Sequence, residues 1–339
     1  MLKSFNLKPI LPHFLALLLL VPGLSAQASQ ASQSSQAAKR TAIVLNSGEA
    51  TVSLIDMDKR TVYKNFYVGK EPHHLMITPD QKSVLVANAA SDDVVFLDPK
   101  TGRIQSRLPN IIDPYHIGYS PDKKWFVAAG NRLDRVDIYA ANNQELKMVK
   151  IVKAAKTPSH IAFTSDSKLT FVTLQDSNEL IAIDLATQEI VWRMVVGKMP
   201  AGVWMTPGDK YLLVGLTGSD SVKVIDWKQQ KIVKDIKTGR GAHNFRPLGD
   251  KKHIFLTNRV DSTISIIDMD KMEKVDDIKG LPSGPDCMDV TADGKELWVT
   301  FRFAKKVGII DIASRKLIST IPVGRSPHGI FFHPSAPWE

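Results

Sequence analysis

The chain has 339 residues, a formal net charge of +9 at pH 7 and one cysteine, Cys287. A single cysteine excludes an internal disulfide, so the fold must be held together by packing and hydrogen bonding. The positive charge does not indicate nucleic-acid binding, because the lysines are spread over predicted turns instead of forming one basic stripe.

Residues 1–28 have the organisation of a secretory signal peptide. Lys3 and Lys8 precede an apolar run from Phe14 to Val21, and Ala26-Gln27-Ala28 offers a small-residue cleavage site. The apolar run is shorter than the roughly 20 residues that span a bilayer, so we expect no membrane anchor after cleavage. The sequence therefore predicts export to the periplasm, or secretion, of a mature chain with a charge of about 9 − 2 = +7.

Residues 29–40 are rich in Ser, Gln and Ala and predict a flexible linker. From residue 41 to residue 339 the chain repeats, and one anchor position returns every 42 to 44 residues. The anchors are Pro72, Pro114, Pro158, Pro200, Ala242, Pro285 and Pro327. A fixed period in this range is typical of solenoids and propellers, and it favours one domain because each repeat needs its neighbour.

The repeat from Gly69 to Leu108 predicts four short strands separated by turns. We expect the strands at 74–78, 83–88, 94–98 and 103–108, and we call them A, B, C and D. The turn between A and B is Pro79-Asp80-Gln81-Lys82, in which proline fixes φ and aspartate bonds the backbone ahead of it. Asp98 closes strand C, and we interpret it as a turn cap. Seven four-stranded units predict an all-β, seven-bladed propeller.

The two ends of the repeat region predict how the ring closes. Residues 41–67 supply strands B, C and D with no strand A before them, and residues 329–333 supply one strand A with nothing after it. We therefore expect the N-terminal strands to pair with the C-terminal strand in a shared blade. Such pairing leaves no open sheet edge.

Several segments resemble the YVTN-repeat family of β-propellers. Its strand B signature is matched by Leu85–Asn88, Phe255–Asn258 and Ile43–Asn46, its next strand by Ser221–Asp226, and its repeat opening by Pro327–Ile330. The resemblance covers residues 41–339 and implies an exported seven-bladed propeller. More distant relatives of that family include the haem-carrying propeller of nitrite reductase, proteins that assist in making its haem, and sugar lactonases.

Histidines recur just after the anchors, where the D–A connections and the B–C turns emerge on the same face. The first position after the anchor holds His73, Tyr115, Ser159, Ala201, His243, Asp286 and His328. The second position holds His74, His116, His160, Gly202, Asn244, Cys287 and Gly329. Six of the nine histidines are therefore expected at the mouth of one channel.

Two interpretations of these histidines stay open beside a ligand site. In one, each imidazole bonds the backbone of a neighbouring blade, and repetition copies the device. In the other, the histidines and the cysteine bind a transition metal or haem, because imidazole and thiolate are natural ligands for zinc, copper and iron. The metal candidates are His74, His116, His160 and Cys287.

A third interpretation adds arginines from the B–C turns. Arg132, Arg259 and Arg302 are expected beside the histidines, where guanidinium groups can grip a carboxylate or a phosphate through two hydrogen bonds. Loop residues on a rigid scaffold are common binding residues. Together with His73, His74, His116, His160, His243 and His328, these arginines form the predicted ligand-binding set.

The sequence favours a binding or scaffold protein over an enzyme. It contains no glycine-rich phosphate loop, and only His243 beside Arg259 supports a lactonase-like hydrolysis. We therefore predict that a small anionic ligand or a protein partner docks on the histidine- and arginine-bearing face, without a cofactor. The alternative is a haem- or metal-binding protein, or a hydrolase, that uses the same face.

Overall fold

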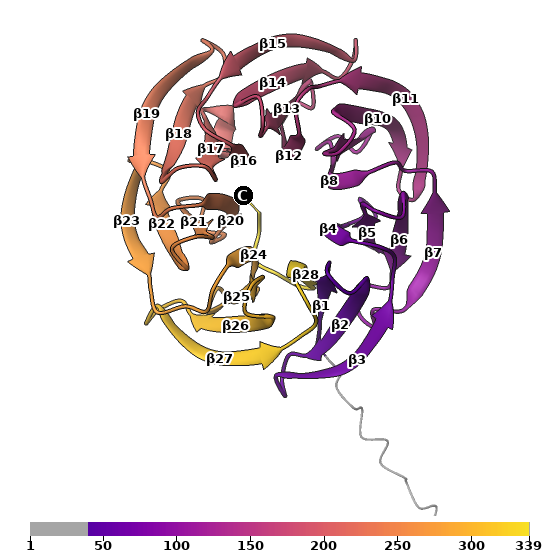
Figure 1. Cartoon of the computed structure of the whole chain (residues 1–339), viewed down its shortest axis with the longest axis vertical. Helices are drawn as coiled ribbons and strands as arrows, with labels where there is room; N and C mark the ends of the chain where they lie inside the picture. Colours follow the sequence, from indigo (N-terminus) through magenta and orange to yellow (C-terminus); the bar gives the residue numbers. More distant parts are fainter. Residues whose placement is uncertain (1–39, 339) are drawn as a thin grey trace, which may run out of the picture. The chain divides into compact units, whose positions relative to one another are not determined.

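The computed structural model describes residues 40–338, so the predicted signal peptide and nearly all of the predicted linker lie outside the described residues. Residues 40–338 form seven antiparallel sheets of four strands each. The sheets are arranged as blades around a central opening, in chain order (Figure 1). The predicted seven-bladed propeller is confirmed.

Each blade has one strand of each type, from the centre of the ring outward. The A strands are β4 (Pro72–Ile77), β8 (Pro114–Tyr119), β12 (Pro158–Phe163), β16 (Pro200–Met205), β20 (Ala242–Pro247), β24 (Pro285–Val290) and β28 (Pro327–Phe332). The B strands are β5 (Val84–Asn88), β9 (Trp125–Gly130), β13 (Leu169–Leu174), β17 (Leu212–Leu216), β21 (His253–Asn258), β25 (Glu296–Phe301) and β1 (Thr41–Asn46). The C strands are β6 (Asp93–Leu97), β10 (Arg135–Asn142), β14 (Glu179–Asp184), β18 (Ser221–Asp226), β22 (Thr263–Asp268), β26 (Lys306–Asp311) and β2 (Thr51–Asp56). The D strands are β7 (Ile104–Pro109), β11 (Glu145–Lys153), β15 (Glu189–Val195), β19 (Lys231–Lys237), β23 (Glu273–Ile278), β27 (Lys316–Pro322) and β3 (Thr61–Tyr67).

The four strands predicted between Gly69 and Leu108 are present as β4 to β7, with ends that differ by one or two residues. One short 3₁₀ turn, η1 (Pro207–Asp209), occupies an A–B turn. In the part of the chain that the structure covers, no helix is long and apolar enough to cross a bilayer.

The ring closes as predicted, because β28 pairs with β1. The blade has the order β28-β1-β2-β3, so its strand A comes from the C-terminus and its other strands from the N-terminus. Ala42 pairs with Phe332 and Val44 with Ile330 in an antiparallel ladder. Figure 1 shows the yellow β28 beside the indigo β1.

The hydrophobic core lies between blades. Seven apolar clusters are found among the described residues, and each one joins two neighbouring sheets. Aromatic side chains cross these interfaces, as where Trp298 meets Phe332 at a ring distance of 5.8 Å. Both faces of a blade are therefore buried, which explains why the B and C strands are apolar along most of their length.

The turn aspartates and the signature asparagines have structural roles. Asp98 accepts hydrogen bonds from the backbone N–H groups of Lys100 and Thr101, as expected of a turn cap. Asn258 donates to the hydroxyl groups of Thr263 and Ser265 and so ties strand B to strand C. These residues stabilise the turns and the strand pairing within a blade, and neither Asp98 nor Asn258 lines the channel cavity.

Candidate functional site

A β-bulge at the start of strand A builds the site in every blade. The register of the A–B ladder shifts just after the anchor, for example between Pro72 and His74 in β4 and between Pro285 and Met288 in β24. A bulge adds one residue to a strand and re-aims the side chains beside it. We therefore treat the two positions after the anchor as two layers inside the channel.

The first layer consists of His73, Tyr115, Ser159, Ala201, His243, Asp286 and His328. All of these except Tyr115 are at most 1% exposed. The ring of His73 lies between those of Tyr115 and His328, with centroid distances of 3.8 Å to each. His73 Nδ1 also donates to the backbone carbonyl of Tyr115 at 2.8 Å, which is the contact that the structural interpretation of the histidines predicted. The side chains of the first layer are therefore buried and packed against one another.

Asp286 is the charged centre of the first layer. Arg259 Nη2 lies 2.8 Å from each of its carboxylate oxygens, and Arg302 Nη1 lies 3.5 Å from Oδ2. Nitrogen atoms of His243 and His328 each lie 3.5 Å from Oδ1. Burial alone would raise the pKa of Asp286, but Arg259 and the other nearby groups hold that pKa well below its usual value. Asp286 is therefore a carboxylate.

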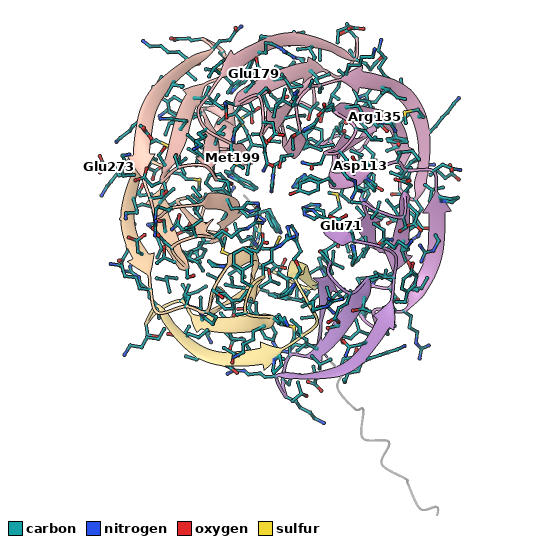
Figure 2. All side chains as sticks on the ribbon, viewed as in Figure 1. Glu71, Asp113, Arg135, Glu179, Met199 and Glu273 are labelled. Carbon is teal, nitrogen blue, oxygen red and sulfur yellow. The ribbon has the colours of Figure 1, made fainter. Side chains whose placement is uncertain are left out.

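The three predicted arginines are paired with carboxylates of the protein itself. Arg259 and Arg302 share Asp286, while Arg132 contacts Glu71 at 2.7 Å and Asp113 at 3.0 Å. The labels of Figure 2 place Glu71 and Asp113 beside β4 and β8, at the inner side of the ring. The structure therefore brings Arg259 and Arg302 to the histidines, whereas Arg132 belongs to a separate ion-pair group on the rim.

The second layer consists of His74, His116, His160, Gly202, Asn244, Cys287 and Gly329. The rings of His74 and His116 are 4.0 Å apart, and those of His116 and His160 are 4.6 Å apart. Burial lowers the pKa of His74 to about 4 and that of His160 to about 3, and it lowers the pKa of His116 well below its usual value. All three imidazoles are therefore neutral at pH 7, with one nitrogen lone pair each.

The opposite side of the second layer carries sulfur and amide groups. Asn244 Nδ2 lies 3.3 Å from Cys287 Sγ, and this sulfur lies 3.5 Å from His328 Nδ1. Burial raises the pKa of the Cys287 thiol far above its usual value, so it is protonated at pH 7. Asp286, Cys287 and His328 offer ligand atoms within 4.8 Å of one another, and together they form a geometric candidate for a metal site.

A cavity of about 340 Å³ begins at the second layer and continues along the A strands. His74, His116, His160, Asn244 and Cys287 line its inner end. Its walls are mainly apolar and include Val203, Phe245, Met288 and Ile330, which come from four different blades. The four residues proposed from the sequence as metal candidates thus line one cavity.

The C-terminal segment, residues 333–338, borders the far end of the cavity through His333, Ser335 and Trp338. Figure 1 shows it running from β28 across the opening. Arg246 of β20 donates to the carbonyl of Ala336 at 2.6 Å, and its guanidinium lies 4.1 Å from the centre of the Trp338 ring. The segment is therefore held against the inner strands.

Sequence reasoning missed the charge pair that holds this segment. Arg246 and Asp289 are 0% and 2% exposed and face each other from β20 and β24. Both occupy the fourth position after an anchor, in adjacent repeats. Opposite charges at the equivalent position of adjacent repeats were the available signal.

The fold and this channel define a β-propeller with a histidine-lined cavity. The model of the YNCE-like β-propellers matches residues 6–338, so the chain belongs to that family. No curated protein matches the chain by sequence.

Solved structures with the same fold come from several kinds of protein. A functionally unknown protein from Desulfotomaculum acetoxidans has a TM-score of 0.75 and 13% identity, with 86% of this chain and 98% of that chain covered. Dihydro-heme d1 dehydrogenase NirN in complex with DHE has a TM-score of 0.64 and 15% identity, with 86% and 75% covered. A protein provisionally assigned as a 6-phosphogluconolactonase from Bacteroides uniformis has a TM-score of 0.70 and 14% identity, with 87% and 99% covered. At these identities the likeness concerns the fold alone.

Proposed function

We propose that this chain is an exported binding protein that holds one small, mainly apolar molecule inside its channel. The cavity of about 340 Å³ between the second layer and the C-terminal segment carries this proposal. Ligand pockets typically have volumes of roughly 300–1,000 Å³, apolar walls and a few convergent polar groups. The signal-peptide pattern predicted for residues 1–28 supports export.

Unpartnered polar atoms at both ends of the cavity indicate how a ligand would be oriented. Nδ1 of His74 and of His116, and Nε1 of Trp204, are buried and have no hydrogen-bond partner within residues 40–338. A buried polar atom without a partner costs about 1–3 kcal/mol. A ligand with one polar group at the imidazole end and one acceptor near Trp204 would satisfy these atoms.

The charges around the channel favour a neutral ligand over the anion expected from the sequence. Arg259 Nη2 already donates hydrogen bonds to both carboxylate oxygens of Asp286, and Arg246 is paired with Asp289. An anion at Arg259 would compete with a carboxylate that is fully buried and fixed in place. No carboxylate among the described residues is bound to the neutral imidazoles of His74 and His116, so a neutral ligand would meet no competing group there.

Native mass spectrometry can test the proposal on protein purified from its native host. We expect an additional mass that is released when the protein unfolds. Val203→Phe places a larger side chain in the cavity wall and should abolish the additional mass. Val191→Phe is the matched control, because Val191 is 52% exposed on the outer strand β15 and away from the channel.

Two results would contradict the proposal. One is the absence of any additional mass from correctly folded native protein under gentle ionisation. The other is retention of the additional mass by Val203→Phe, which would place the ligand outside the cavity.

A further inference from the structure

We propose that the inner end of the cavity is a binding site for monovalent copper, formed by the imidazoles of His74, His116 and His160 and by a sulfur atom of the cavity wall. This inference uses the cavity of the proposed function, but it does not require an organic ligand. The copper ion is itself the species bound, and it would occupy the polar end of the channel.

The three imidazoles are gathered by equivalent positions on consecutive inner strands. Each follows the bulge of its own blade, on β4, β8 and β12, and the ring distances are 4.0 and 4.6 Å. The A–B ladders fix the three backbone positions. Ligands that are 42 and 44 residues apart in the sequence are thereby brought together.

The rings are available to a metal. Neither His74 nor His116 makes a side-chain hydrogen bond to another residue in the described part of the chain, and Nδ1 of each is buried without a partner. His160 Nδ1 is 2.9 Å from the hydroxyl of Ser159. Such a contact at one ring nitrogen is how proteins orient a histidine whose other nitrogen binds a metal.

The remaining donors in the cavity select the metal. Three sulfur-containing residues, Met76, Met288 and Cys287, line the same cavity as the imidazoles. The carboxylate of Asp289 also reaches it, but that carboxylate is bonded to Arg246 at 2.9 Å. Thioether and thiolate ligands select monovalent copper, whereas magnesium, calcium and manganese need oxygen ligands. A neutral set of nitrogen and sulfur atoms in an apolar wall fits a singly charged soft ion best.

Met76 is the thioether that we assign first. It lies two residues after His74 on β4, so the two side chains leave the same face of the strand. The Cys287 thiol is a weaker candidate, because its sulfur already contacts Asn244 Nδ2 at 3.3 Å and His328 Nδ1 at 3.5 Å.

The cluster of Asp286, Cys287 and His328 is a poorer cation site, although its ligand atoms lie within 4.8 Å of one another. Arg259 is 2.8 Å from both oxygens of Asp286, and Arg302 is 3.5 Å from one of them. A cation bound there would face two fixed positive charges. The second layer has no charged neighbour of this kind among the residues that line the cavity.

The test uses untagged full-length mature protein that has been stripped of metal. Monovalent copper is titrated without oxygen against a coloured chelator of known affinity. We expect one equivalent to bind, with at least a tenfold loss of affinity in His116→Asn and in His74→Asn. His253→Ala is the matched control, because His253 contacts Asp250 near an A–B turn and does not line the cavity. Circular dichroism and the melting temperature show whether each variant is folded.

X-ray absorption on the copper-loaded wild type identifies the ligands without a variant. We expect nitrogen atoms together with sulfur, and loss of sulfur in Met76→Leu but not in Met148→Leu, since Met148 is exposed on β11. The proposal is overturned by less than 0.1 equivalent of copper on folded wild type, by unchanged affinity in both histidine variants, by ligation without sulfur, or by tighter binding of zinc than of copper. None of these results affects the mass-spectrometric test with Val203→Phe, so the two proposals fail separately.

Discussion

Arg246 and Asp289 form a buried ion pair between two neighbouring blades, with Nε and Nη2 of the arginine 3.0 and 2.9 Å from one carboxylate oxygen. The same guanidinium donates to the carbonyls of Ala336 and Pro337. Burial raises the pKa of Asp289 to about 6 in spite of its partner. One residue of β20 therefore joins two blades and the C-terminal segment.

Removing this arginine should be costly. Arg246→Met leaves the Asp289 carboxylate buried without its charged partner, so we expect a loss of about 3–5 kcal/mol in the free energy of unfolding. Urea denaturation measures it. The exposed pair Lys150–Glu189 is the control, and Lys150→Met should cost less than about 1 kcal/mol. An equal effect of the two substitutions would show that the buried pair has no special weight.

Asp286 should be needed to neutralise Arg259 and Arg302, which both contact its carboxylate. Asp286→Ala removes the only carboxylate within 3.5 Å of both Arg259 and Arg302 in residues 40–338, so we expect a lower melting temperature. Acetate should restore part of the loss by entering the space that the side chain has left, and chloride should restore less. In Asp286→Asn that space stays filled, so acetate should have no specific effect. Equal responses of the two variants to acetate would contradict this account.

The ring itself could be predicted from the sequence. The repeat indicates the order of the strands, and the incomplete first and last repeats indicate that β28 pairs with β1. The repeat also predicted that His73 and His74 lie near one channel, but not the backbone geometry that lets two successive residues face it. Two successive residues of a regular strand point to opposite faces, and only the bulge turns both into the channel. The bulge depends on pairing between strands and has no local signal.

The pairing of the arginines and the position of the tail were hidden for different reasons. Asp286 and Arg259 come from different blades, so their contact depends on how far a side chain reaches across the ring. Trp338 follows the last repeat and has no counterpart in earlier repeats from which its position could be inferred. The repeat could therefore predict where the histidines gather, but not what closes either end of the cavity.

Gly202 should be required by the close approach of two blades. A Cβ atom at this position would lie 1.9 Å from the backbone carbonyl oxygen of His243, which cannot move without its strand. We expect Gly202→Ala to cost about 1–3 kcal/mol, as overpacking usually does, and to disturb the second layer. Gly130→Ala is the control, because its nearest contacts would be at 3.3 Å. Urea denaturation of both variants measures the difference, and a cost for Gly202→Ala no larger than that of the control would contradict the model of the interface.

The buried histidines should make the protein sensitive to acid. Burial lowers the pKa of each of the six channel histidines, to about 4 for His74 and about 3 for His160 and His328. In the unfolded chain a histidine has a pKa of about 6.5. Between about pH 6.5 and pH 4 the unfolded state therefore binds more protons, so stability falls as the pH falls through this range.

Each histidine that stays neutral only in the folded state contributes up to about 1.4 kcal/mol per pH unit. Three carboxyls oppose the effect, since burial raises the pKa of Asp113 and raises that of Asp137 and of Asp289 to about 6, but the histidines outnumber them. We expect the urea midpoint to drop steeply from pH 7 to pH 5. His116→Asn should flatten that dependence, because it removes one titrating group. A slope that His116→Asn does not alter would mean that this ring is protonated equally in the folded and unfolded states.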